Sequence, residues 1–367
     1  MTNPDMDVVE VSASPDESHI DKLRAGVDAW NQWRADRTIV PLLAGVDLTD
    51  LTLTGADLSG ADLRGADLSD ADLHDADLHD ADLRDADLFA TDLTKANLKM
   101  TSLVGADMSL ARLCNADLYK ADMAGAFMTE ADLSGAYLAC ADLAGADLRG
   151  AVLRDVNASE ASLRHARLDK ADLCGANLSS ADITDAHLNQ ANLDTVNLFR
   201  VSYGSFQSME GHFFGIRGLQ SAHGNALFVR DAQDQDYIET LRRTIDDQPV
   251  AATRVIRRVA FSLWARIDYG RSLGKLAMYA LMVALGFGVV FAFDRAFDWG
   301  LLDYSGGSGS ALSPFYFSII TYTTLGFGDI TPASWQGEVL VVAEVIFGYV
   351  TLGLLLSILA NRVARRA

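Results

Sequence analysis

A nine-residue stretch near the C-terminus has the residue types of a cation site built from backbone oxygens. Residues 321–329 read Thr-Tyr-Thr-Thr-Leu-Gly-Phe-Gly-Asp, so two glycines alternate with bulky residues. Glycine takes positive φ as readily as negative φ, and a chain alternating between the two signs can point successive carbonyls one way. Carbonyl oxygens so aligned can replace the water shell of a potassium ion. An ordinary glycine-containing loop is the alternative, and the flanking sequence has to decide between the two.

The flanking segments are long and apolar. Residues 276–293 contain no charged side chain, and as a helix they extend about 27 Å, close to the thickness of the hydrocarbon core. Residues 339–360 form a second apolar segment, interrupted only by Glu344. Both segments are predicted to be transmembrane helices.

A short helix is predicted between the two spans, just before the glycine-alternating stretch. Ser313 is expected to be its N-cap and Pro314 its first residue. Residues 315–322 are apolar and too few to cross a membrane, so the helix is expected to be re-entrant. Its C-terminal end would then point partial negative charge toward the membrane centre, which favours a cation there.

This order of segments resembles the two-helix potassium channels over residues 276–361. The string Thr-Thr-Leu-Gly-Phe-Gly-Asp is similar to their selectivity filter, Thr-Val-Gly-Tyr-Gly-Asp, with Leu325 and Phe327 in place of valine and tyrosine. The resemblance implies four chains per pore, because each chain supplies one filter segment. It implies permeant K⁺ and no cofactor. The oxygens that bind the ion would come from Thr324, Leu325, Gly326, Phe327 and Gly328, with the Thr324 hydroxyl at the inner site.

Further residues are expected to support or move this filter, and they are Thr323, Asp329, Glu344, Gly348 and Gly353. For Glu344 two roles stay open: a hydrogen bond behind the filter, or a place near the cavity that raises cation occupancy. Gly348 lies where inner helices of bacterial potassium channels carry a hinge glycine, and Gly353 is a second candidate. Close helix packing is the alternative for both glycines. Phe327 lacks the hydroxyl with which tyrosine braces the filter, yet potassium is still expected to be preferred over sodium.

A five-residue period, Ala-Asp-Leu-x-x, runs without a break through residues 46–200 and gives 31 units. A helix of 3.6 residues per turn would spread this pattern over all its faces, whereas a fixed short period indicates a solenoid with leucine and alanine inside. The pattern resembles the pentapeptide-repeat family, which implies a right-handed, four-sided β-helix. The predicted fold is therefore an all-β quadrilateral β-helix joined to an α-helical membrane pore domain. We call residues 46–200 the repeat array.

The net charge of −20 lies mostly in the repeat array, which holds 28 of the 50 acidic side chains and 12 basic ones. Asp occupies 17 of the 31 second positions. Three readings remain open: these short side chains hydrogen-bond the local backbone, they imitate the charge of DNA, or they form an acidic docking surface for a cytoplasmic protein or a sister subunit. Nucleic acid itself is not expected as a partner.

Four domains are predicted: a tail with a capping helix at 1–45, the repeat array, a connector at 201–275, and the pore domain at 276–367. Within the connector, residues 253–264 suggest an amphipathic helix with Arg254, Arg257 and Arg258. Such a helix suits an anionic membrane surface and its lipid. A soluble helix packed on the connector is the alternative.

Basic residues precede the first span and follow the second, whereas the loop between them, residues 294–338, has few. By the positive-inside rule, both termini are therefore expected in the cytoplasm. No cleavable signal peptide is expected, and the three cysteines are too scattered for a disulfide framework or a zinc site. No arrangement of residues suggests an enzyme. The sequence thus predicts a homotetrameric, potassium-selective channel, multi-pass in a bacterial plasma (inner) membrane. The alternative is a membrane-tethered acidic scaffold with a non-conducting pore.

Overall fold

The fold was described from a computed structural model. It separates into two compact units, residues 1–243 and residues 244–367, which are treated individually below. The structure describes residues 16–35, 39–205, 211–247, 251–266, 272–306, 310–323 and 328–364.

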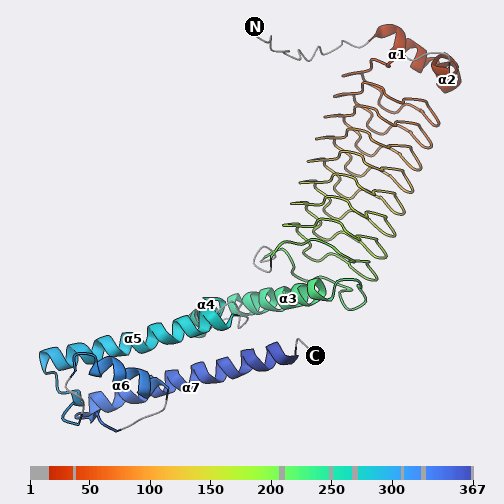
Figure 1. Ribbon diagram of the computed structural model, residues 1–367. Coiled ribbons are helices and arrows are strands. Elements are labelled where there is room, and N and C mark those ends of the chain that lie inside the picture. Colours follow the sequence, from red (N-terminus) through yellow and green to blue (C-terminus); the bar gives the residue numbers. More distant parts are fainter. Residues whose placement is uncertain are drawn as a thin grey trace, which may run out of the picture. The chain divides into compact units, whose positions relative to one another are not determined.

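The repeat array forms a β-helix in which each unit up to residue 182 stacks on the unit 20 positions later (Figure 1). Parallel bridges join Asp62 to Asp82 and Asp82 to Ser102, and the Leu63 amide donates to the Asp82 carbonyl at 2.8 Å. Four five-residue units therefore make one coil. The leucine and alanine columns are buried along the whole array. Because these columns stay inside through every coil, the predicted β-helix is confirmed.

The aspartates at the second position of the units bind the backbone beside them. The Asp67 carboxylate accepts from the Ser69 amide at 3.1 Å, and Asp132 accepts from the Ser134 amide at 3.0 Å. Across coils, the Asn97 side-chain amide donates to Asp77 at 2.8 Å. This local hydrogen bonding corresponds to the first of the three readings of the acidic columns.

The last residue of all 31 units has positive φ, between 54° and 73°. L-residues with side chains adopt this left-handed region at a cost, which glycine avoids and which aspartate and asparagine reduce. This explains why glycine, aspartate or asparagine holds the position in just over half of the units, although the sequence analysis did not assign it a role.

Two short helices close the first coil, α1 (Glu17–Arg24) and α2 (Val27–Ala35). One helix was predicted here. The chain instead breaks at Gly26, whose φ of +113° suits glycine alone. The turn brings Trp30 over the open end of the coil, where its side chain is fully buried.

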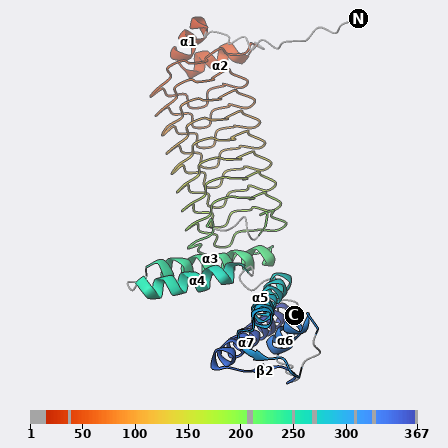
Figure 2. The same cartoon turned by 90° about the vertical axis from the view of Figure 1, so that its left-hand side faces the viewer.

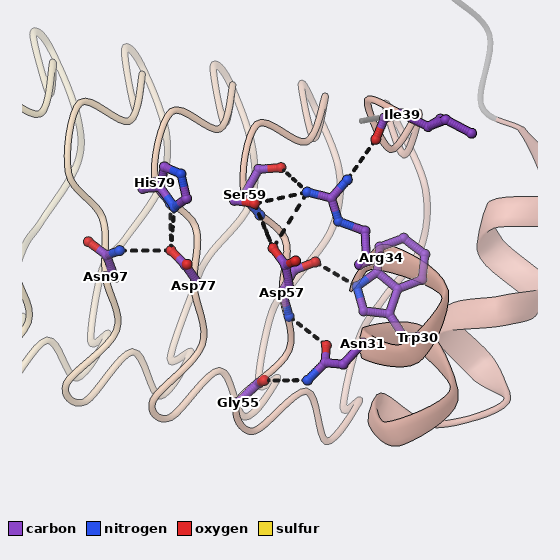
Figure 3. Close-up of polar contacts among 10 residues, drawn as sticks. All are labelled: Trp30, Asn31, Arg34, Ile39, Gly55, Asp57, Ser59, Asp77, His79 and Asn97. Carbon is purple, nitrogen blue, oxygen red and sulfur yellow. Dashed lines mark hydrogen bonds and ion pairs between the residues drawn. The ribbon is translucent and has the colours of Figure 1, made fainter. Parts of the chain in front are cut away.

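Polar side chains of α2 satisfy the edge of that coil (Figure 3). The Trp30 indole donates to the Asp57 carbonyl at 2.7 Å, and the Asn31 carbonyl oxygen accepts from the Asp57 amide at 2.8 Å. The Arg34 guanidinium donates to the carbonyl and hydroxyl oxygens of Ser59 at 2.6 and 2.9 Å. The predicted cap therefore covers the first coil with both hydrogen bonds and apolar contacts.

The stacking continues beyond the last repeat. Asn192 pairs with Arg217 and Asn197 with His223, so residues 211–223 add a wider turn to the coil. Helix α3 (Ala226–Asp246) follows and crosses the end of the β-helix opposite α1 and α2 (Figure 2). Its Phe228 is fully buried against this end.

The second unit contains three helices in mutual contact and one helix before them. Helices α5 and α7 run side by side, with the short α6 between them at one end (Figure 1). A two-stranded antiparallel pairing joins the segments on either side of α6, a feature that the sequence analysis missed. The elements are α4 (Ala251–Arg266), α5 (Leu273–Phe297), β1 (Leu302–Asp303), α6 (Ser313–Tyr322), β2 (Thr331–Pro332) and α7 (Trp335–Ala364).

Candidate functional site

Helix α6 is seated closely on α5. A β-carbon on Gly288 would lie 2.6 Å from Phe315 Cδ1, so only glycine permits this approach. The Phe291 and Phe317 rings meet edge to face with their centroids 5.5 Å apart. Ser313 was expected to be the N-cap, but it is the first helical residue, and Leu312 precedes it without a side-chain cap bond. Pro314, which was expected to be the first residue of the helix, is its second residue and lies in the first turn.

Glu344 of α7 reaches α6 across the interior of the second unit. Its side chain is fully buried and hydrogen-bonded to the Ser318 hydroxyl, which is fully buried as well. Ser318 Oγ also lies 2.6 Å from the Ala284 carbonyl oxygen of α5. One serine therefore ties all three helices together at the middle of α6.

Hydrogen counting constrains this cluster. A serine hydroxyl has one hydrogen to donate, yet Ser318 Oγ faces both the Ala284 carbonyl and the Glu344 carboxyl. The Ala284 carbonyl and the Glu344 carboxyl therefore share the single hydroxyl hydrogen of Ser318. Within the described part of the chain, the second Glu344 oxygen has no partner. Glu344 thus lies behind α6, with no surface of its side chain open to solvent in this chain.

The candidate filter begins where α6 ends. Thr323 caps the helix, and its hydroxyl donates to the Ile319 carbonyl at 2.8 Å. Thr324, Leu325, Gly326 and Phe327 lie outside the described residues. Gly328 has a φ of +77°, in the left-handed region expected of a glycine-alternating segment. Asp329 is exposed.

The chain after the filter stretch is anchored to the end of α5. Ile330 is buried with Phe291 and Leu302, and Leu302 pairs with Pro332 in the short sheet. A β-carbon on Gly306 would lie 2.5 Å from the Asp329 carbonyl oxygen, so this glycine allows the loop to cross the segment.

Asp294 organises this anchor from the last turns of α5. Its buried carboxylate accepts from the Leu301 and Leu302 amides at 2.8 and 3.1 Å. The Tyr304 hydroxyl donates to the Phe291 carbonyl at 2.8 Å and lies 3.2 Å from Asp294 Oδ2. Burial, with the neighbouring Asp294 carboxylate, raises the pKa of Tyr304, so its hydroxyl keeps the proton that it donates.

The candidate hinge glycines of α7 have different surroundings. Gly348 faces the Tyr322 carbonyl at the end of α6 so closely that a β-carbon would overlap it. Around Gly353 no atom lies within 4 Å of a β-carbon position. Gly337 approaches the Leu301 carbonyl much as Gly348 approaches Tyr322. The close-packing alternative therefore has a clear geometric basis at Gly348 and none at Gly353.

Sequence reasoning missed Ser318, Asp294 and Tyr304. The signal for Asp294 was available, because a carboxylate at the end of an apolar span needs partners. Ser318 gave no such signal, since a serine in a short apolar helix fits many environments. The three arginines grouped with the membrane surface lie on α4, where Arg257 and Arg258 are exposed and Arg254 is half-buried.

Comparison with known families assigns each of the two parts of the chain to a protein family. Segments between residues 43 and 194 match the pentapeptide repeats, with eight copies, and residues 278–365 match the ion channel family. Two families are joined in this chain: a pentapeptide-repeat β-helix and an ion channel domain. The predicted fusion is confirmed, and the channel match together with two apolar helices makes this a membrane protein.

Curated relatives of the channel domain are potassium channels by name. Potassium channel subfamily T member 1 of Mus musculus is 43% identical over 53 residues, which cover 14% of this chain and 4% of that protein. Two-pore potassium channel 4 of Arabidopsis thaliana is 37% identical over 91 residues, covering 24% of this chain and 30% of that protein. This chain therefore spans less than a third of either relative. The matches indicate a channel and not an enzyme.

Solved structures resemble the β-helix. The crystal structure of HetL, a pentapeptide repeat protein from the cyanobacterium Nostoc, is 30% identical, with a TM-score of 0.36. The match covers 57% of this chain and 95% of the HetL chain. Full-length QnrB1, a plasmid-mediated fluoroquinolone resistance protein, is 15% identical, with a TM-score of 0.30, covering 53% of this chain and 96% of that one.

Proposed function

We propose that this protein is a potassium-selective channel that conducts K⁺ passively through a pore formed by four copies of the chain. The observation that carries the proposal is the Thr-Thr-Leu-Gly-Phe-Gly-Asp string, placed directly after a short helix that is seated between two membrane-spanning helices. The names of the curated relatives support potassium as the ion. Carbonyl oxygens from 324–328 would replace the hydration shell of the ion.

Residues around the filter would hold its shape. Thr323 ends α6 by bonding back to Ile319, and Glu344 secures α6 through Ser318. Asp329 follows the last filter glycine and would lie at the outer mouth. The C-terminal end of α6 directs its partial negative charge toward the segment where the ion would enter the filter.

The topology follows from the distribution of basic residues. Both termini would lie in the cytoplasm of a bacterial cell, with residues 294–338 on the outer side of the plasma membrane. The repeat array would then be a cytoplasmic domain that serves assembly, docking of a protein partner or gating.

Potassium flux from liposomes tests conduction. Purified protein reconstituted with K⁺ inside should release it when the charge is balanced by an ionophore, and the Gly326→Asp variant should not, because a side chain at this glycine blocks the carbonyl-lined path. A wild-type protein that forms tetramers yet releases no potassium would overturn the proposal in favour of a membrane-tethered scaffold.

Removal of residues 1–200 tests the role of the array. Loss of the tetramer would assign it to assembly, whereas a tetramer with altered open probability would assign it to gating. An unchanged tetramer with unchanged opening would leave docking of a partner as its role.

A further inference from the structure

Helix α4 presents a surface that is exposed among the described residues of its unit. Residues 255–260 are all exposed, and this run is longer than one helical turn. Three of them are large and apolar, with Val255, Ile256 and Val259 between 55% and 69% exposed. An isolated helix of this length is marginal in water, so a helix with so little packing needs another surface to stabilise it.

The C-terminal end of α4 is packed on the pore-domain helices, which places α4 relative to them. Trp264 packs against the buried cluster formed by Leu276 at the start of α5 and Ile358 near the end of α7. In the proposed topology, these are the ends at which both apolar helices leave the membrane on the same side. Helix α5 runs across the view in Figure 1 and is seen end-on in Figure 2, whereas α4 runs across Figure 2. Because α4 lies across the spans, it lies along the membrane plane.

The charge of α4 indicates what it meets there. The helix contains no acidic residue and four arginines, among them Arg254, Arg257 and Arg258. Arg258 also binds the Asp246 carboxylate at 2.8 Å, and its side chain is still 57% exposed. Val255, Ile256 and Val259 fall on one face of the helix, and Arg258 lies at the edge of that face. Apolar residues flanked by arginine suit the boundary between acyl chains and anionic headgroups.

We propose that α4 docks on anionic phospholipids of the leaflet at which α5 begins and α7 ends. Val255, Ile256 and Val259 enter the acyl boundary, and the arginines reach the phosphates with their long side chains. Through Trp264, the lipid-bound helix contacts the ends of both pore helices. The inference rests on the membrane insertion contained in the proposed function and is independent of ion conduction.

Lipid contact can be measured without measuring flux. Cys114, Cys140 and Cys174 lie on the repeat array and are replaced by serine, and Ile256→Cys then carries an environment-sensitive fluorophore. The full chain is placed in nanodiscs of phosphatidylcholine, with or without phosphatidylglycerol, that contain brominated lipid. The matched control restores Cys140 and carries the same label there.

Bromine should quench the label at residue 256 much more than the label at residue 140, and more strongly when phosphatidylglycerol is present. Arg257→Gln should lower the ratio of lipid-bound to unbound α4 by roughly fivefold in the anionic nanodiscs, because one positive charge near the surface is removed.

Equal quenching at the two positions would overturn the proposal and indicate that water surrounds residue 256. Protection of residue 256 from both lipid and aqueous quenchers would also overturn it and would indicate a second copy of the chain as the neighbour. Quenching that is independent of phosphatidylglycerol would overturn the anionic preference. A protein that docks in this way and passes no potassium would refute the channel proposal alone.

Discussion

At the scale of single residues, the contact between Ser318 and Glu344 is the polar link among the three pore-domain helices. A carboxyl group in the interior of a membrane protein is costly unless it has partners. Here the hydroxyl of one serine serves both Glu344 and the α5 carbonyl of Ala284. The position of the Glu344 side chain therefore depends on Ser318, which carries no charge.

Ser318→Ala should lower the stability of the protein in nanodiscs by about 1–3 kcal/mol, because it leaves the buried Glu344 carboxyl without a partner. Thermal unfolding is the measurement. Adding Glu344→Met removes the second polar group as well, and the double variant should recover most of the loss. Additive losses in the double variant would show that the two residues act independently.

Within the array, Asp62 couples folding to pH. The Arg64 guanidinium donates two hydrogen bonds of 2.8 Å to this carboxylate and lowers its pKa. The unfolded chain then binds a proton more readily than the folded one. The stabilisation is therefore complete above the pKa of an unfolded aspartate, about 4, and is lost as pH falls below it.

Calorimetry between pH 6 and pH 3 should show an array that unfolds at lower temperature in acid. Asp62→Asn keeps the bond to the Arg64 amide but loses the charge, so its unfolding temperature should depend less steeply on pH. An unchanged slope in this variant would contradict the assignment of the effect to Asp62.

At the scale of elements, the helical cap determines how the solenoid ends. Stacked coils are stabilised by their neighbours, so an uncovered terminal coil frays. Trp30→Ala removes the buried ring and its bond to Asp57, and such a truncation typically costs about 3–5 kcal/mol.

Hydrogen exchange should localise this loss to the first coil, residues 42–62, with little change in the middle of the array. Phe89→Ala is a matched control, since Phe89 is an exposed aromatic residue about two coils further along the array. Exchange that rises evenly along all coils of the Trp30 variant would show that the cap is not a local stabiliser.

Helix α7 offers a direct comparison between its two candidate hinges. Gly348→Ala places a methyl group against the Tyr322 carbonyl, so it should destabilise the packing of α6. Gly353→Ala meets no atom and should stabilise the helix by about 0.5–1 kcal/mol. Thermal unfolding and channel opening are measured on both. If Gly353→Ala impairs opening while leaving stability unchanged or higher, Gly353 is the hinge; if Gly348→Ala is harmless, the packing account is wrong.

The sequence predicted those elements that rest on long periodic signals. The Ala-Asp-Leu period was enough for the β-helix, and long apolar runs, the second interrupted only by Glu344, were enough for α5 and α7. It did not predict contacts that join residues far apart in the chain, such as Ser318 with Glu344 or Leu302 with Pro332. Nor did it predict the break at Gly26, because the apolar spacing of Leu23, Val27 and Trp30 continues through it.

At the scale of the whole molecule, a pentapeptide-repeat β-helix and an ion channel domain share one chain. The repeat array carries most of the negative charge, whereas the unit with α5 and α7 carries the apolar spans. The proposed pore would need several copies of the second unit, because each chain would provide a single filter segment. The account as a whole therefore depends on whether that assembled pore selects potassium.

Planar-bilayer recording with potassium on one side and sodium on the other at equal concentration tests this claim most directly. A potassium-selective filter predicts a reversal potential displaced from zero by about 59 mV for every tenfold of selectivity, with Gly326→Asp silent under the same conditions. Currents from the wild-type protein that reverse near zero would contradict the account, because they would show a pore that does not distinguish potassium from sodium.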